Sequence, residues 1–341
     1  MSVALVTGAA GLVGSHVVER LTNDSWTVRA LARDPERTRS ALPWPVEVHH
    51  GDVLDEASFT RAARGCDVVF HTAANVIVSG GWDAYRVTNI EGTRNAIAAA
   101  AAAKARLLHV SSVAVYGSAR YDAAQLGGKT DEFGQLKPLK ERAHYARSKR
   151  ESEELVMRAH REGRVWATAV RPDVIYGRRD RHFVPRMATL IRRGVIPLLR
   201  GGRTTLAIVH AANVAQGCVL AATTDSAGGK AFNLANDFDV TVRRFFELGG
   251  EGVGSSPRFL PLPMWFARGT IRSVRAVMKF MTAGQFSLVS GTALSFISED
   301  NPFSSDRARR ELGWHPAVRP EEGIPDAFRW AMETKNKKAR P

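Results

Sequence analysis

The chain has 341 residues, of which 44% are apolar and 24% charged, a composition typical of soluble globular proteins. No apolar run reaches the length that spans a membrane, and no cysteine–histidine cluster has metal-ligand spacing. The first apolar run begins at Val3, which leaves no room for a signal peptide. Cys66 and Cys218 are expected to be buried thiols, so we expect a cytoplasmic protein. The length is sufficient for one large domain or two unequal ones.

The formal net charge of +14 is unevenly distributed along the chain. Residues 176–203 hold eight arginines against one acid, Asp180, and residues 252–298 hold no acid. A field of this sign attracts phosphates, anionic lipid or nucleic acid. A solvated basic surface is the alternative, and no specific nucleic-acid partner is expected.

The first motif is a glycine turn between an apolar run and a helical pattern. Gly8, Gly11 and Gly14 follow the spacing G-x-x-G-x-x-G, which differs from the more common G-x-G-x-x-G. Gly8 permits a tight turn, Gly11 lets the backbone approach a pyrophosphate, and Gly14 lets the helix pack on the strand. Phosphates would meet the helix N-terminus at Leu12 and Val13. The spacing therefore predicts a nucleotide cofactor.

The second predicted strand, residues 26–33, ends where the adenosine ribose would lie. An acid there would bind the ribose hydroxyls, whereas an arginine can hold a 2′-phosphate. Arg33 occupies this place with Arg37 nearby, so NADP is favoured and NAD is the alternative. After the third predicted strand, residues 46–50, Asp52 would accept a hydrogen bond from the adenine amino group while Val53 packs on the ring.

Apolar runs and helical patterns continue to alternate. A helix at 56–64, a strand at 67–71, an alanine-rich helix at 96–103 and a strand at 107–110 follow in order. The small residues Thr72, Ala73 and Ala74 leave space for the cofactor backbone. Five strands that alternate with helices predict an α/β fold with a doubly wound parallel sheet.

The residues that suit hydride-transfer chemistry are Ser112, Tyr145 and Lys149. Tyr145 and Lys149 lie four residues apart on a predicted helix, so both project from one helical face. A phenol has an unperturbed pKa of about 10, and a nearby ammonium lowers that pKa. Tyr145 would exchange a proton with the substrate oxygen, Ser112 would hydrogen-bond that oxygen, and Lys149 would also hold the nicotinamide ribose.

Together these motifs resemble the extended short-chain dehydrogenase/reductases of the NAD-dependent epimerase/dehydratase superfamily. The matching segments, which extend over essentially the whole chain, are Thr7-Gly8-x-x-Gly11-x-x-Gly14, Gly51-Asp52-Val53, His71-Thr72-Ala73-Ala74, Asn89-x-x-Gly92-Thr93, Ser111-Ser112, Tyr145-x-x-x-Lys149 and Arg171-Pro172-x-x-x-Tyr176-Gly177. The resemblance implies a Rossmann domain, a smaller C-terminal substrate domain, a Ser112–Tyr145–Lys149 catalytic set, a cofactor contact at Pro172 and a homodimer.

The predicted domains are discontinuous in sequence. Residues 1–172 and 204–235 are assigned to the NADP-binding Rossmann domain, which the strand around 206–209 rejoins. Residues 173–203 and 236–330 are assigned to the substrate-binding domain, and residues 331–341 to a basic tail.

Three departures from the family pattern indicate which branch of the family the chain resembles. Val113 and Ala114 occupy the places of the Asp-Glu pair of sugar-nucleotide dehydratases, so dehydration is not expected. Leu206 occupies the place of an arginine that grips the diphosphate in sugar-nucleotide epimerases. The segment Asn213-Val214-Ala215 resembles 3β-hydroxysteroid dehydrogenase-like members.

The resulting prediction is an NADP-dependent oxidoreductase that interconverts a ketone and a secondary alcohol on an apolar, steroid-like or long-chain substrate. Candidate pocket residues are Val113, Trp82, Tyr176, His182 and Phe183. The alternatives are a sugar-nucleotide 4-epimerase with bound NAD, and a non-catalytic NADP-sensing or nucleic-acid-binding protein.

Residues 264–281 combine an apolar stripe with an adjoining stripe of arginine and lysine. Such a segment can cover the mouth of an apolar pocket or lie on an anionic membrane surface. We expect a lid, with peripheral membrane contact as the alternative.

Overall fold

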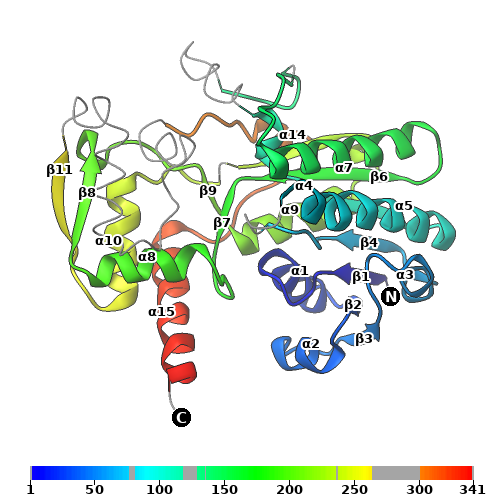
Figure 1. The fold of residues 1–341 in the computed structure, drawn as a ribbon, viewed down its shortest axis with the longest axis horizontal. Helices are drawn as coiled ribbons and strands as arrows, with labels where there is room; N and C mark the ends of the chain where they lie inside the picture. The colour runs from blue at the N-terminus through cyan, green and yellow to red at the C-terminus, as the bar shows by residue number, and fades with distance from the viewer. Residues whose placement is uncertain are drawn as a thin grey trace.

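A parallel seven-stranded sheet forms the centre of the computed structural model, which describes residues 2–76, 81–117, 129–134, 136–235, 237–262 and 300–339. The strand order is β10-β6-β5-β4-β1-β2-β3 (Figure 1). The strands are β1 (Val3–Thr7), β2 (Thr27–Ala32), β3 (Glu47–His50), β4 (Val68–His71), β5 (Arg106–Val110), β6 (Ala167–Pro172) and β10 (Ala231–Leu234). This order confirms the predicted doubly wound α/β fold.

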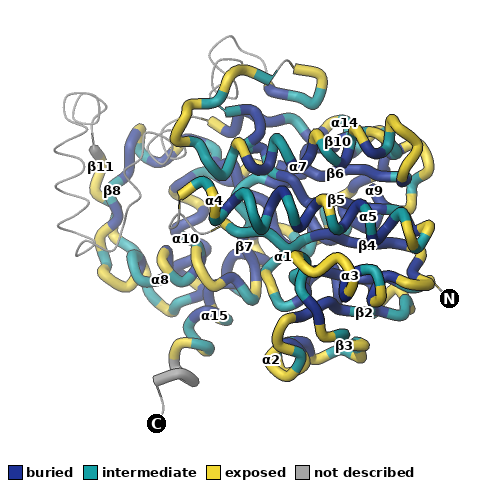
Figure 2. The backbone as a smooth tube through the Cα atoms, turned by 45° about the vertical axis from the view of Figure 1, so that its right-hand side comes forward, coloured by how far each residue is buried: buried dark blue, intermediate teal, exposed yellow. Residues whose placement is uncertain are grey.

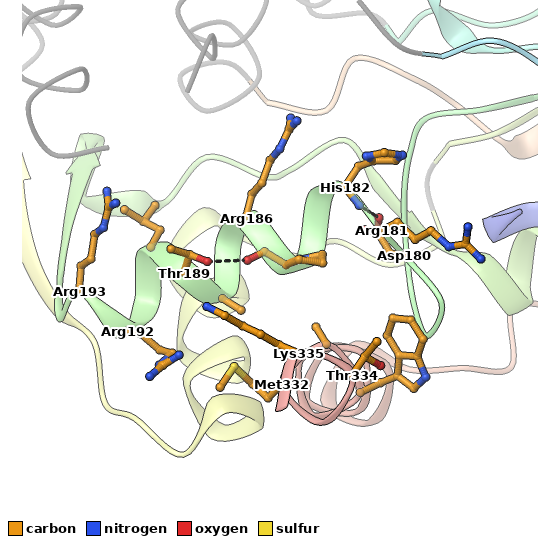
Figure 3. Close-up of a pocket in the computed structure, with 15 residues that line it drawn as sticks. Asp180, Arg181, His182, Arg186, Thr189, Arg192, Arg193, Met332, Thr334 and Lys335 are labelled. Carbon is orange, nitrogen blue, oxygen red and sulfur yellow. Dashed lines mark hydrogen bonds between the residues drawn. The ribbon is translucent and has the colours of Figure 1, made fainter. Parts of the chain in front are cut away.

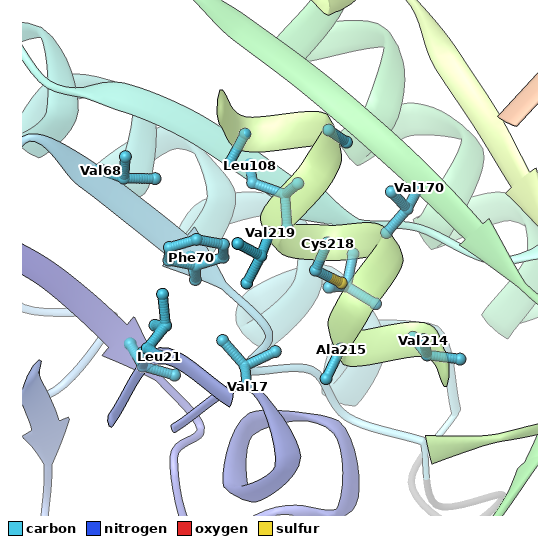
Figure 4. Close-up of a cluster of buried hydrophobic side chains, with 14 of the residues drawn as sticks. Val17, Leu21, Val68, Phe70, Leu108, Val170, Val214, Ala215, Cys218 and Val219 are labelled. Atoms are coloured by element: carbon cyan, nitrogen blue, oxygen red, sulfur yellow. The ribbon is translucent and has the colours of Figure 1, made fainter. Parts of the chain in front are cut away.

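Helices cover both faces of this sheet. They are α1 (Leu12–Asn23) and α9 (Ala211–Thr223) on one face, and α3 (Glu56–Ala63), α5 (Gly92–Ala103) and α7 (His144–Arg161) on the other. Alternate residues of one strand serve the two faces, since Val6 packs with α1 and α9 whereas Leu5 packs with α3 and α5. Figure 4 shows the first of these layers, where Val17 of α1 lies beside Ala215 of α9.

The alanine-rich segment forms a helix that packs closely on the sheet. Ala96, Ala99 and Ala100 of α5 are fully buried. Short side chains allow this close approach and favour the helical conformation. In Figure 2 the strands at the centre are dark blue, because they are buried between the two helical layers.

A second hydrophobic cluster lies beside the sheet, at the left of Figure 1. Its elements are α8 (Phe183–Arg192), β8 (Val195–Leu199), α10 (Val242–Val253), β11 (Arg258–Leu262) and α15 (Pro320–Ala339), and β8 pairs with β11 in parallel. Phe328 of α15 packs closely on α10, since a Cβ on Gly252 would lie 2.6 Å from its Cβ. We refer to these elements as the substrate half, after the role that the sequence predicts for them, and to the main sheet with its helices as the Rossmann half.

The contacts cross the predicted domain boundaries in three places. The strand expected to rejoin the Rossmann domain, β9 (Ile208–His210), pairs with β7 (Val174–Tyr176) in a separate two-stranded sheet, and Val209 packs in the Rossmann core. The helix α14 (Asp306–Leu312) and Trp314 pack on the Rossmann core, and the Trp314 indole donates to the Asn213 carbonyl at 2.9 Å. The residues assigned to a basic tail continue α15 to Ala339, and Ala331 is buried in the second cluster.

The remaining elements are short. They are α2 (Pro35–Ala41), α4 (Gly81–Tyr85), the π-helix η1 (Arg86–Glu91) and the 3-10 turns η2 (Val113–Tyr116), η3 (Arg200–Gly202) and η4 (Asp225–Ala227). No helix among the described residues is long and apolar enough to cross a membrane. Cys66 and Cys218 are free and buried, as predicted. The predicted lid at 264–281 lies outside the described residues.

Candidate active site

The turn after β1 allows a phosphate group to approach the backbone closely. Gly8 has a φ of 67°, which glycine adopts readily, and the Gly11 N–H donates to its carbonyl at 2.8 Å. A Cβ on Gly14 would lie 2.2 Å from the Gly8 carbonyl oxygen. Because glycine has no Cβ, the first turn of α1 can pack against the turn that follows β1. Gly11 caps α1 without a side-chain hydrogen bond, which leaves the N–H groups of Leu12 and Val13 for an anion. These residues fit the diphosphate of a dinucleotide.

The predicted cofactor residues lie at the carboxyl ends of parallel strands. The strand order changes direction between β1 and β4, and nucleotides bind at such switch points in α/β proteins. Arg33 is exposed after β2, and Asp52 and Val53 are partly buried after β3. The same edge carries Thr72, Ala73 and Ala74 after β4, and Pro172 at the end of β6.

The segment after β4 packs directly on the glycine turn. The Thr72 hydroxyl donates to the Thr7 carbonyl at 2.7 Å, which joins the ends of β4 and β1. A Cβ on Gly8 would lie 2.9 Å from the backbone nitrogen of Ala73. Small residues at both positions therefore keep this part of the edge open to a cofactor.

Ser112 and Tyr145 are brought together from two elements. Ser112 follows β5 and caps η2, where its Oγ accepts a hydrogen bond from the Ala114 N–H at 3.1 Å. Tyr145 lies in the first turn of α7, and its phenol shares a hydrogen bond with the Ser112 hydroxyl. The rings of Tyr85 and Tyr145 lie 6.2 Å apart between centroids. Two hydroxyl groups at this place can hold the same substrate oxygen.

The pKa of Tyr145 differs from the sequence expectation. We expected the Lys149 ammonium to lower it, but burial raises the pKa of the phenol above its ordinary value. The hydrogen bond from Ser112 acts in the opposite direction and the nearby Tyr85 adds to the increase. The expectation was wrong because the free energy needed to remove the phenolate from water exceeds the stabilisation that the Ser112 hydrogen bond gives it. The phenol is therefore held in its protonated form.

Lys149 lies one helical turn beyond Tyr145, and its side chain is 3% exposed. Its Nζ donates to the Val110 carbonyl at the end of β5 at 2.7 Å. Burial lowers the pKa of Lys149 to about 8, while Glu153 acts to raise it. The ammonium is thus anchored at the carboxyl edge of the sheet. Burial lowers the pKa of His71 and His109, and the charge of Lys149 lowers it further.

Asn89 holds the first turn of α7 in place, a role that the sequence analysis did not assign. It lies in the π-helix η1 and is 2% exposed. Its side chain accepts a hydrogen bond from the Asn75 N–H at 2.6 Å and donates to the Ser148 hydroxyl at 2.9 Å. That hydroxyl donates to the Tyr145 carbonyl at 2.9 Å. The Asn89-x-x-Gly92-Thr93 motif was visible in sequence, but its partners are distant along the chain.

A buried ion pair supports the next turn of α7. Arg171 of β6 contacts Glu153 through Nε and Nη2, and both side chains are 8% exposed. Arg171 also donates to the Tyr116 hydroxyl at 2.7 Å, which in turn donates to Asn233 at 2.8 Å. This network joins α7, β6, η2 and β10 around the site.

Two arginines from the segment between β7 and α8 contact α1 and the glycine turn. Arg179 forms an ion pair with Glu19 of α1 and donates to the Ser15 hydroxyl at 3.0 Å. Arg181 reaches the Ala10 carbonyl in the glycine turn at 3.4 Å. The charge of this segment was visible in sequence, but its position against the glycine turn was not.

The predicted pocket residues do not form one group. Tyr176 is 1% exposed, packs against Phe245 and His210, and belongs to the core of the substrate half. Phe183 packs against the same core, and Val113 is buried in a small cluster beside η2. Trp82 lies near α7, with the Arg147 guanidinium 4.0 Å from its ring. His182 is exposed at the start of α8.

The family model for the NAD dependent epimerase/dehydratase family matches residues 4–235. This chain belongs to that family. Within it, the motifs are those of the extended short-chain dehydrogenase/reductases, and 3β-hydroxysteroid dehydrogenase-like proteins are among its relatives. The chain is an NAD(P)-dependent oxidoreductase.

Two relatives and one solved structure illustrate these likenesses. A 4-hydroxy-2-methyl-3-oxo-4-farnesyl-3,4-dihydroquinoline-1-oxide ketoreductase of Stigmatella aurantiaca is 29% identical over 327 residues, 96% of this chain and 95% of that protein. A 3 beta-hydroxysteroid dehydrogenase/Delta 5→4-isomerase of Mycobacterium tuberculosis is 28% identical over 350 residues, 95% of this chain and 89% of that protein. A Thermus thermophilus UDP-glucose 4-epimerase in complex with NAD shares the fold, with a TM-score of 0.71, 22% identity, and 97% and 99% of the two chains covered.

Proposed function

We propose that this extended short-chain dehydrogenase/reductase is an NADP(H)-dependent ketoreductase that acts on an apolar substrate. The observation that carries the proposal is the hydrogen-bonded pair of Ser112 and Tyr145 at the end of β5, with a buried Lys149 one turn away. The three residues come from two elements that meet at the cofactor edge of the sheet.

In this proposal Ser112 and Tyr145 hold the carbonyl oxygen of the substrate, and Tyr145 donates a proton to it. The coenzyme supplies the hydride when it is bound. Burial raises the pKa of Tyr145, so the phenol carries a proton at neutral pH that it can donate to a carbonyl oxygen. In the proposal Lys149, which lies one helical turn beyond Tyr145 and whose Nζ is anchored on the Val110 carbonyl, binds the nicotinamide ribose.

NADP is proposed over NAD because of the end of β2. Arg33 and Arg37 are exposed there, and neither side chain makes an ion pair within the described ranges of the chain. A guanidinium can hold a 2′-phosphate by two parallel hydrogen bonds. The acid that would prefer a free ribose is absent from the end of the strand.

The apolar substrate class is inferred from relatives and from one core residue. The relatives include a ketoreductase of a farnesylated quinoline oxide and a 3 beta-hydroxysteroid dehydrogenase. Leu206, in the place of the diphosphate-gripping arginine of epimerases, is 3% exposed and belongs to the core of the substrate half. A buried leucine offers no charge to a sugar nucleotide, so the ketoreductase is preferred to the 4-epimerase.

The proposal is tested with NADPH that carries deuterium at C4 and a panel of apolar ketones, including steroid and long-chain ketones. We expect NADPH oxidation that matches alcohol formation, with one deuterium on the new carbinol carbon. Epimerisation of a UDP-sugar without net change in the cofactor, together with inert ketones, would replace the proposal by the epimerase.

A further inference from the structure

A cationic pocket lies between α8 and α15, on the substrate half. Its volume is about 550 Å³, a size typical of small-molecule sites. Both helices contribute basic side chains, as Figure 3 shows, with Arg186 and Arg192 on α8 and Lys335 on α15. The catalytic residues Ser112, Tyr145 and Lys149 are not among the lining residues, so this pocket is not part of the proposed active site.

The charge of this pocket is not neutralised by its own lining. Asp180 is the single acid among the described lining residues. It is 3% exposed, and its carboxylate accepts hydrogen bonds from the N–H groups of His182 at 2.7 Å and Val184 at 2.8 Å at the start of α8. Arg192 and Lys335 make no ion pair with any residue that the structure describes. Their charges are therefore available to an anion.

Apolar side chains line the same space. Leu190 of α8, and Trp330 and Met332 of α15, lie in the wall, and Trp330 and Met332 also pack on the core of the substrate half. A ligand that satisfies both kinds of wall carries a negative group for the basic side chains and an apolar part for these three. Guanidinium groups match phosphate oxygens by paired hydrogen bonds, and a doubly charged anion gains most from several cations.

We propose that this pocket binds the phosphate group of an organic phosphate whose apolar part packs on Leu190, Trp330 and Met332. The inference goes beyond the proposed ketoreductase and does not depend on it. A soluble alkyl phosphate and a phospholipid headgroup present the same chemistry, so the test includes both sources. Since Arg192 and Lys335 are exposed, binding is weakened by salt.

The test compares two double variants of the full-length protein. Arg192→Gln with Lys335→Gln removes two charges from the pocket. Arg61→Gln with Lys104→Gln removes the same two charges from exposed positions of the Rossmann half, far from the pocket in sequence and on other elements. Circular dichroism and the melting temperature establish that each variant is folded. Calorimetric titration with hexyl phosphate measures the free source, with hexanol as the uncharged control. Co-sedimentation with phosphatidylcholine vesicles containing phosphatidic acid measures the lipid source.

We expect the unmodified protein to bind hexyl phosphate or the anionic vesicles, and hexanol at least about tenfold more weakly than hexyl phosphate. The pocket variant should lose at least about tenfold in affinity for whichever source binds, and the control variant less than about twofold. Equal losses in the two variants would show a general charge effect and overturn the proposal, as would no binding of either source. Binding is measured without coenzyme, so the result is independent of ketone turnover, which neither variant should change.

Discussion

The Rossmann half and the substrate half of this molecule are built in different ways. The Rossmann half is a single parallel sheet, and the predicted cofactor and catalytic residues come from turns at its carboxyl edge and from the helix α7. The substrate half is gathered from three separate segments, 173–209, 237–262 and 320–339, around a smaller core. Its small sheets have two strands each. In a regular parallel sheet, the strand order determines which loops lie next to one another. In a region built from separate segments, the positions of side chains depend on tertiary contacts between those segments.

The polar interactions of the two halves differ as well. The Rossmann half buries an ion pair, Arg171 of β6 with Glu153 of α7, inside a hydrogen-bonded network. Around α10 in the substrate half, the described ion pairs are exposed, such as that between Arg243 and Glu247 at 3.8 Å. Buried pairs are costly to break and exposed pairs contribute little. The two halves therefore differ in how much stability their ion pairs are expected to carry.

The largest expected effect is on the buried pair. Glu153→Gln leaves the Arg171 guanidinium without its carboxylate at a site where both side chains are 8% exposed. We expect the free energy of unfolding to fall by about 3–5 kcal/mol. The matched variant Glu247→Gln in α10 should lower it by less than about 1 kcal/mol, because that pair is exposed. Urea denaturation measures both, and equal losses would remove this difference between the two halves.

The second prediction concerns the junction between the halves. His16 of α1 lies beside His210 and near Arg179, and burial lowers its pKa to about 3. The folded protein holds His16 neutral while the unfolded chain protonates it below its ordinary pKa of about 6.5. Stability should therefore fall as the pH decreases from about 6.5 toward 3, by about 1.4 kcal/mol per pH unit for this residue.

The variant His16→Asn should reduce that slope by about the same amount, because it removes the group that titrates. Urea denaturation at pH 4 to 7 gives the slope for both proteins. A slope that is the same with and without His16 would mean that the junction does not keep this imidazole neutral.

The third prediction tests the cofactor preference of the Rossmann half. Arg33→Ala removes the exposed guanidinium at the end of β2, and we expect NADPH to bind about tenfold more weakly. NADH binding should change less than about twofold, because it lacks the 2′-phosphate. Quenching of protein fluorescence measures both dissociation constants, with Arg61→Ala as the control for an exposed arginine. Similar losses for the two coenzymes would remove Arg33 from 2′-phosphate recognition.

Most of the Rossmann half could be predicted from sequence because its signals are local. A strand, three glycines at fixed spacing and a helix specify the turn at Gly8, and alternation of strands and helices specifies the sheet. The parallel doubly wound sheet and the α7 helix that carries Tyr145 and Lys149 follow from the same patterns. The predicted site residues accordingly lie along one sheet edge.

The features that sequence did not reveal depend on contacts between distant segments. The raised pKa of Tyr145 reflects burial by several elements, and Asn89 acts on Tyr145 through Ser148. The pairing of β9 with β7 and the packing of Trp314 on the Rossmann core join segments that the sequence assigned to different domains. The cationic pocket joins α8 to a helix more than a hundred residues later.

The central claim is that the phenol of Tyr145 donates the proton during ketone reduction. The direct measurement is the single-turnover rate of ketone reduction by the Tyr145→Phe variant with bound NADPH. The dissociation constant of NADPH is measured for the same variant. We predict a rate lower by about 10²–10⁴-fold with NADPH affinity changed less than about twofold, because the ring stays and the proton donor is lost. A variant that reduces the ketone at the original rate would contradict the account.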